Sequence, residues 1–115
     1  MKVLLTGGTG FIGSGLISKL VELEHDVYCL ERYVTGRYVL GDQHKVKTIF
    51  GDLRDNFSIR RIISDVQPDV VIHLAGLISV EESIKNPNIY LKNNLVASMN
   101  ILESMRKTNV NKIIF

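Results

Sequence analysis

The 115 residues suffice for one domain with a modest hydrophobic core, and a formal net charge of +2 is too small to indicate a nucleic-acid-binding protein. A single cysteine, Cys29, excludes a disulfide framework and favours a reducing, cytoplasmic compartment. The N-terminus enters an apolar segment without a signal peptide, and the most apolar stretch, Val70–Val80, is too short to cross a membrane.

Strand-like and helix-like segments alternate along the chain. In order, we expect a strand at Lys2–Leu5, a helix at Phe11–Glu24, a strand at Asp26–Leu30, an irregular segment at 31–45, a strand at Val46–Phe50, a helix from the N-cap Asp55 to Val66, a strand at Asp69–Leu74, a helix from Pro87 to about Lys107, and a strand at Asn111–Phe115. Such alternation implies right-handed crossovers and a parallel sheet covered on both faces. The sequence therefore predicts a doubly wound α/β fold with strand order 3-2-1-4-5, in which the chain ends within the fifth strand.

The last predicted helix carries an apolar stripe. Its apolar residues recur every three or four positions, which is the spacing of one helix face. We expect the fold to bury five of them: Leu91, Leu95, Met99, Leu102 and Met105.

Three glycines follow the first strand at equal spacing, namely Gly7, Gly10 and Gly13. Gly7 permits a tight turn, Gly10 lets the main chain approach a phosphate closely because it has no Cβ, and Gly13 allows close packing of the helix against the sheet. The first helical N–H groups, at Phe11 and Ile12, and the positive end of the helix dipole then face an anion. The strand before and the helix after favour a pyrophosphate-binding loop over a plain glycine-rich turn.

Five segments, in order, match the motifs of one family. They are Thr6-Gly7-Gly8-Thr9-Gly10-Phe11-Ile12-Gly13; Glu31 at the end of the second strand; Gly51-Asp52-Leu53-Arg54-Asp55; His73-Leu74-Ala75-Gly76; and the stretch from Glu82-Ser83 through Pro87, Tyr90 and Asn94 to Leu102-Glu103. Together they resemble the extended short-chain dehydrogenases/reductases, the NAD-dependent epimerase/dehydratase family, and the last segment is most similar to UDP-glucose/galactose 4-epimerases. The resemblance covers the whole chain and implies one NAD(P)-binding Rossmann domain over residues 1–115, as the N-terminal part of a longer protein.

Residues after the second and third strands are candidates for the adenosine half of the cofactor. A carboxylate about twenty residues after the glycines can accept both ribose hydroxyls, so Glu31 favours NAD. Arg32 and Arg37 leave NADP open, because either guanidinium could bind a 2′-phosphate. Asp52 can accept from the adenine amino group while Leu53 contacts the ring; the alternative is a simple helix-capping role for Asp52.

The segment after the fourth strand is expected to shape the rest of the pocket. By the resemblance, Leu74, Ala75 and Gly76 run past the pyrophosphate and the nicotinamide ribose. His73 lies within an apolar strand, so we expect it to be packed and not to act as a base. Asn94 is polar on an otherwise apolar helix, where it either bonds neighbouring loops or faces solvent.

The catalytic pair of the family, Tyr-x-x-x-Lys, is missing from the chain. The four tyrosines, Tyr28, Tyr33, Tyr38 and Tyr90, are followed four residues later by Arg32, Arg37, Asp42 and Asn94. The serine or threonine that assists this pair, and the sugar-nucleotide domain, would lie beyond Phe115. We therefore expect no catalytic residue and no metal site in these residues, and no turnover by the chain alone.

The resemblance implies the NAD(P)-binding portion of a nucleotide-sugar epimerase or 4,6-dehydratase, an isomerase or a lyase that acts by transient oxidation at sugar C4. Ile78 stands where many UDP-galactose 4-epimerases carry lysine, which leaves other epimerases and the dehydratases open. One alternative is a non-catalytic dinucleotide-binding module that serves as a sensor or assembly subunit. Another is an NADPH-dependent reductase of the same family.

The expected partners are a nucleotide-sugar substrate in the full-length parent and a second copy of the chain, with no nucleic acid and no membrane. Ile113, Ile114 and Phe115 would form an uncovered edge strand at the end of the chain. Because such an edge is a template for pairing with another molecule, we expect a homodimer or other self-association.

Overall fold

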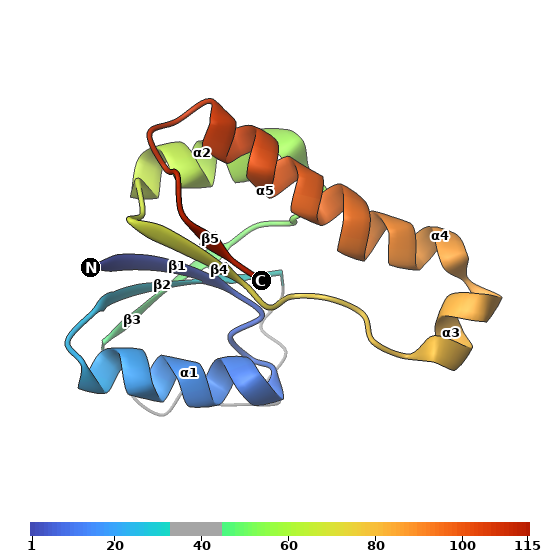
Figure 1. Ribbon diagram of the computed structural model, residues 1–115, viewed down its shortest axis with the longest axis horizontal. Helices are drawn as coiled ribbons and strands as arrows, with labels where there is room; N and C mark the ends of the chain where they lie inside the picture. The colour runs from blue at the N-terminus through green and yellow to red at the C-terminus, as the bar shows by residue number, and fades with distance from the viewer. Residues whose placement is uncertain (33–44) are drawn as a thin grey trace.

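The computed structural model describes residues 1–32 and 45–115, in which helices cover both faces of a central sheet (Figure 1). The elements are β1 (Lys2–Thr6), α1 (Phe11–Glu22), β2 (Asp26–Glu31), β3 (Val46–Phe50), α2 (Asn56–Val66), β4 (Val70–His73), α3 (Val80–Lys85), α4 (Pro87–Tyr90), η1 (Leu91–Val96, a π-helix), α5 (Ala97–Arg106) and β5 (Ile113–Ile114). Most of the predicted irregular segment, residues 31–45, lies outside the described residues.

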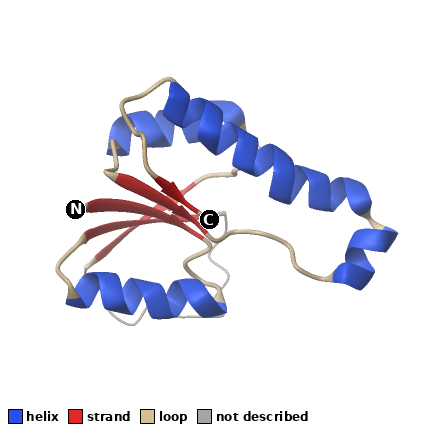
Figure 2. Ribbon diagram, in the orientation of Figure 1, coloured by secondary structure: helices blue, strands red, loops and turns tan. Residues whose placement is uncertain are grey.

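The five strands, red in Figure 2, form one parallel sheet. Their order is the predicted one, β3-β2-β1-β4-β5. Leu4 of β1 lies opposite Tyr28 of β2 on one side and Val71 of β4 on the other. The chain thus builds outward from β1 in one direction and then, through β4, in the other. A reversal of this kind leaves a crevice beyond the carboxyl ends of β1 and β4, where ligands bind in open α/β sheets.

Alternate residues of the strands pack into two separate cores. Leu4 lies in the core beneath α2 and α5, together with Ile63 and Ile101. Val3 and Leu5 lie in the core beneath α1. Because both faces of the central strands are covered, β1 and β4 are apolar except at their ends.

Local signals explain where the first helices begin and end. The Asp55 carboxylate accepts a hydrogen bond from the Phe57 N–H at 3.1 Å, so it caps α2 as predicted. Gln67 then ends α2 in the left-handed conformation. The first helix ends at Glu22, before the predicted Glu24, because Glu24 also takes a positive φ of 58°.

The predicted helix from Pro87 forms as three consecutive elements, α4, η1 and α5. A separate short helix, α3, precedes it and was not predicted; the Ser79 hydroxyl accepts the Glu82 N–H at its start. In Figure 1, α3 and α4 extend beyond the end of the sheet. None of the helices in the described parts of the chain is long and apolar enough to span a membrane.

The prediction that the fold buries the whole apolar stripe of this helix is wrong. Met105 is buried, but four residues of the stripe are between 45 and 58 % exposed: Leu91, Leu95, Met99 and Leu102. The face that packs on the core contains instead Ala97, Ile101, Ser104 and Met105. Both sets have helical spacing, but only Ile101 and Met105 share the core with α2, and the small side chains of Ala97 and Ser104 are buried on the same face.

Candidate functional site

A cleft of about 190 Å³ lies beyond the carboxyl ends of the strands. Its walls come from the segments that follow β1, β2, β3 and β4 and from the helix η1–α5. The lining residues are Gly7, Leu30, Glu31, Arg32, Gly51, Asp52, Leu53, Arg54, Ala75, Gly76, Leu77, Asn93 and Ala97. Since pockets for whole drug-sized ligands usually measure about 300–1,000 Å³, this cleft fits part of a larger ligand.

At each of the three glycines of the loop, an added side chain would meet different surroundings. Gly7 has a φ of +74°, and a Cβ there would lie 2.7 Å from the Ala75 nitrogen, so the β4 segment packs directly on the loop. A Cβ on Gly13 would overlap the Gly7 carbonyl, so Gly13 seats α1 against the loop and not against the sheet as we expected. A Cβ on Gly10 would contact only the Gly7 oxygen, at 3.2 Å, which leaves the outer side of Gly10 open.

The first turn of α1 faces this open space. Gly10 is the N-cap of α1, and no described side chain caps the helix. The side chains of Phe11 and Ile12 are 88 % and 70 % exposed. Uncapped N–H groups and the positive end of the helix dipole make this turn suitable for an anion.

Glu31 ends β2, and its carboxylate is held on both oxygens. Oε2 accepts a hydrogen bond from the Thr9 hydroxyl and Oε1 accepts one from the Cys29 thiol, each at 3.0 Å. Gly8 packs above this group, because a Cβ there would overlap the Cys29 sulfur. The loop after β1 and the acid after β2 are therefore one connected unit.

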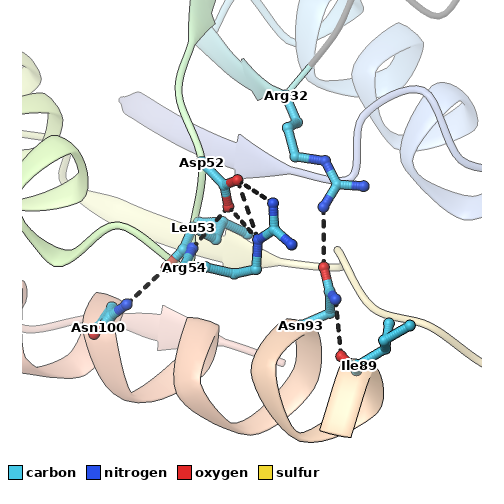
Figure 3. A network of polar contacts seen from close by, with 7 residues as sticks. All are labelled: Arg32, Asp52, Leu53, Arg54, Ile89, Asn93 and Asn100. Carbon is cyan, nitrogen blue, oxygen red and sulfur yellow. Dashed lines mark hydrogen bonds and ion pairs between the residues drawn. The ribbon is translucent and has the colours of Figure 1, made fainter. Parts of the chain in front are cut away.

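Arg32 reaches across the cleft from β2 to the helix (Figure 3). Its Nη1 donates to the Asn93 Oδ1 at 3.0 Å, and the Asn93 amide nitrogen donates to the Ile89 carbonyl at 2.8 Å. Arg32 therefore bridges two walls of the cleft. Arg37, the other candidate for a 2′-phosphate, lies outside the described residues.

Asp52 lies after β3 and pairs with Arg54 (Figure 3). The Arg54 main-chain N–H, Nε and Nη2 all donate to this carboxylate, at 2.5 to 3.1 Å. The Arg54 hydrogen bonds lower the pKa of Asp52, so the carboxylate is charged at neutral pH. These contacts, two on each oxygen, occupy the acceptor sites of Asp52, so an adenine amino group could bond to it only if one of them opened. Leu53 is tied to α5, because its carbonyl accepts from the Asn100 amide at 2.9 Å.

Asn94 fixes the segment that follows β4. Its Oδ1 accepts the Leu77 N–H and its Nδ2 donates to the Leu77 carbonyl, both at 2.8 Å. Of the two alternatives for Asn94, the structure shows the contact with a neighbouring loop. The bonds place Ala75 and Gly76 at the wall of the cleft, while the half-buried Leu74 packs on the core beneath α1.

His73 is buried beneath the cleft within a chain of hydrogen bonds. The Ala75 N–H donates to the Thr6 hydroxyl at 3.2 Å, and that hydroxyl lies 2.7 Å from His73 Nδ1. On the other side, His73 Nε2 lies 3.0 Å from the Ser98 hydroxyl, which donates to the Asn94 carbonyl. This pattern fits a neutral imidazole with its proton on Nε2, and burial lowers the pKa of His73 accordingly.

The structure brings seven of the fourteen candidate residues into the cleft and places six others around it, while Arg37 lies outside the described residues. Gly7, Glu31, Arg32, Asp52, Leu53, Ala75 and Gly76 line the cleft. Gly10, Phe11, Ile12, Gly13, Leu74 and Asn94 lie around it and do not line it. Sequence reasoning missed four contributors: Thr9, Cys29, Arg54 and Asn93. Arg54 lies within the third motif, and Asn93 directly precedes Asn94. Neither position in the sequence predicts the hydrogen bonds that the residue makes in the structure. No cluster of three histidine, cysteine, aspartate or glutamate side chains that could hold a metal is found among residues 1–32 and 45–115.

Comparisons with known proteins agree with this geometry. Residues 3–115 match the family model described as the NAD dependent epimerase/dehydratase family. The chain is 37% identical over 115 residues to a UDP-glucose 4-epimerase of Lactobacillus helveticus, covering 100% of this chain and 34% of that protein. It is 40% identical over 114 residues to a putative UDP-glucose 4-epimerase of Methanocaldococcus jannaschii, covering 98% of this chain and 36% of that protein. The chain thus spans about a third of the length of these relatives.

Solved structures give the same picture. A UDP-glucose 4-epimerase from Bifidobacterium longum, in complex with NAD⁺ and UDP, superposes with a TM-score of 0.87 at 36% identity, over 100% of this chain and 36% of that chain. The Thermus thermophilus UDP-glucose 4-epimerase in complex with NAD also superposes with a TM-score of 0.87, at 33% identity, over 100% of this chain and 37% of that chain. The Rossmann-like fold predicted from the sequence is therefore confirmed.

Proposed function

The chain belongs to the NAD dependent epimerase/dehydratase family, and on that premise we propose that its cleft binds the adenosine diphosphate half of NAD. The proposal rests on where the fold places three segments. The glycine loop, Glu31 and the Asp52 segment are far apart in the sequence, yet all border one cleft at the point where the strand order reverses. A dinucleotide needs an anion site, a ribose site and an adenine site in this arrangement.

Each subsite has a group that fits it. The N–H groups of Phe11 and Ile12 hold the pyrophosphate beside the open side of Gly10. Glu31 accepts the ribose hydroxyls, and Asp52 with Leu53 takes the adenine once a contact to Arg54 opens. Ala75 and Gly76 continue the wall toward the nicotinamide half.

We propose NAD over NADP because the Glu31 carboxylate borders the cleft, where it would repel a 2′-phosphate. The two solved relatives described above are complexes with NAD. Arg32 keeps NADP as the second candidate, since its guanidinium lines the same cleft.

For the whole protein we propose a nucleotide-sugar 4-epimerase, because the similar proteins described above are UDP-glucose 4-epimerases. When bound, NAD⁺ supplies the hydride acceptor for transient oxidation at sugar C4. This chain contributes binding and orientation, and its residues include no Tyr-x-x-x-Lys pair, so we propose no turnover by the chain alone. A 4,6-dehydratase, an NADPH-dependent reductase and a non-catalytic module are the alternatives. The free, buried Cys29 favours the cytoplasm.

Calorimetry on two valine variants tests the binding proposal. Gly10→Val places a side chain where the phosphate is expected, so NAD⁺ binding should fall below detection. Gly15→Val is the matched control, because Gly15 lies on the exposed side of the same helix with nothing within 4 Å of its added Cβ. Equal heats for both variants and the unaltered chain would contradict the proposal.

We also propose that the exposed stripe of Leu91, Leu95, Met99 and Leu102 pairs with a second copy of the chain, alongside the exposed Ile114 and Phe115.

Light scattering at high concentration measures this pairing. Leu95→Glu should convert a dimer to a monomer, whereas Lys19→Glu on the opposite layer should not. An unaltered chain that is already monomeric would contradict the pairing and would leave the stripe to be covered by another part of a longer chain.

A further inference from the structure

We propose that Thr9 and Cys29 are positioning residues that fix the Glu31 carboxylate and thereby set the preference of the cleft for NAD over NADP. The proposal rests on the proposed function, because it specifies how the ribose site of that function is held in place. It concerns two side chains that contact Glu31 and do not themselves line the cleft.

The hydrogen bonds to Glu31 leave the right number of acceptor sites. Thr9 Oγ1 bonds one carboxylate oxygen and Cys29 Sγ bonds the other, each at 3.0 Å. A carboxylate has about four lone-pair sites on its two oxygens. Each oxygen of Glu31 therefore keeps one site, which matches the two hydroxyls of a ribose.

Cys29 is suited to be a permanent donor. Its side chain is fully buried beneath Gly8, and burial together with the nearby Glu31 raises the pKa of the thiol. The sulfur therefore keeps its proton at physiological pH and donates it to the carboxylate. A Cβ on Gly8 would overlap the sulfur and approach Glu31 Oε1 at 3.4 Å, so the absence of a side chain at Gly8 is part of the same arrangement.

Thr9 connects the ribose site to the pyrophosphate loop. It lies between Gly8 and Gly10, and its hydroxyl crosses to β2 to reach Glu31. A glutamate side chain that is not held by such bonds samples several rotamers and loses conformational entropy when it orders on a ligand. Fixing Glu31 before binding avoids that cost for a ribose diol and keeps a negative charge where a 2′-phosphate would otherwise fit.

The test is the ratio of the dissociation constants for NADP⁺ and NAD⁺, measured by calorimetry on the 115-residue chain. Thr9→Val keeps the shape of threonine and removes the donor, and we expect it to lower this ratio about tenfold. Thr9→Ser keeps the hydroxyl and should leave the ratio within about twofold of the unaltered chain. For Cys29, the donor-free Cys29→Ala should lower the ratio about threefold, and Cys29→Ser should preserve it.

A Glu31→Gln background isolates the contact. There, Thr9→Val should have no further effect on the ratio, since the charge that it positions is gone. Thermal melts followed by circular dichroism check that each variant is folded. If a variant of the buried Cys29 does not fold, the variants of the partly exposed Thr9 still provide the test. Equal effects of Thr9→Val and Thr9→Ser, or the same loss of affinity for NAD⁺ and NADP⁺, would overturn the positioning role. An unaltered chain that binds neither dinucleotide would overturn the proposed function itself.

Discussion

The two halves of the cleft are built from different parts of the polypeptide. On the β1 side, main chain packs on main chain: Gly7 contacts the backbone of Ala75, and Gly13 contacts the Gly7 carbonyl. On the side of β2, β3 and η1, hydrogen bonds between side chains span the gap, as between Arg32 and Asn93 (Figure 3). At Gly7 and Gly13 the main-chain half therefore has no room for an added methyl group, whereas the side-chain half can lose one bond and keep its shape.

The largest effect is expected from adding one methyl group to the main-chain half. Gly13→Ala should lower the free energy of unfolding by about 2–3 kcal/mol, because the new Cβ overlaps backbone atoms that must move. Gly15→Ala, two residues away with open space around it, should raise stability by about 0.5–1 kcal/mol. Urea unfolding measures both variants, and a Gly13→Ala variant as stable as the Gly15→Ala variant would contradict the lack of space in the main-chain half.

A smaller loss should follow from deleting one side-chain amide on η1. Asn94→Ala removes two hydrogen bonds to Leu77 and should cost about 1–2 kcal/mol in urea unfolding. Asn109→Ala, at an exposed position in the loop after α5, should stay within about 0.5 kcal/mol of the unaltered chain. A neutral Asn94→Ala would show that the bonds to Leu77 do not hold the loop.

His73 joins the two halves and should make their stability depend on pH. Its pKa is lowered in the folded chain, so at mildly acidic pH the unfolded chain binds a proton at His73 and the folded chain does not. Stability should therefore be complete above about pH 6.5 and fall below it, by at most about 1.4 kcal/mol per pH unit, until the pH reaches the lowered value. Urea titrations between about pH 5 and 7.5 measure the slope, and His73→Gln should reduce it; an unchanged slope would place the titrating group elsewhere.

The smallest effect should come from Arg54. Arg54→Ala frees the Asp52 carboxylate from its hydrogen bonds, so NAD⁺ affinity should stay within about threefold or increase. Asp52→Ala is the companion variant and should weaken NAD⁺ binding, because the adenine loses its acceptor. Calorimetry that shows a large loss for Arg54→Ala and none for Asp52→Ala would assign the adenine contact to the guanidinium.

The strand order, the turn at Gly7 and the Asp55 cap could be predicted from the sequence because they follow from backbone sterics and hydrogen bonding. The sequence was insufficient where rotamers or helix geometry decide the outcome. The π-helix at Leu91–Val96 cannot be read from spacing, so the contacts of Asn93 were not predicted. The stripe of Leu91, Leu95, Met99 and Leu102 has the same period as the face that is buried, and only the packing of Ile101 and Met105 on the core shared with α2 distinguishes the two.

The most direct test of the central claim is an amide NMR titration of the ¹⁵N-labelled chain with NAD⁺. We predict that the largest shift changes occur at the cleft, at Arg32, Leu53 and Ala75, and in the adjoining first turn of α1, at Phe11 and Ile12. Asp69, Asn109 and Lys112, on a separate surface hollow formed by the turns before β4 and β5, should not respond. Shift changes centred on that second group, or none at a saturating concentration of NAD⁺, would contradict the account.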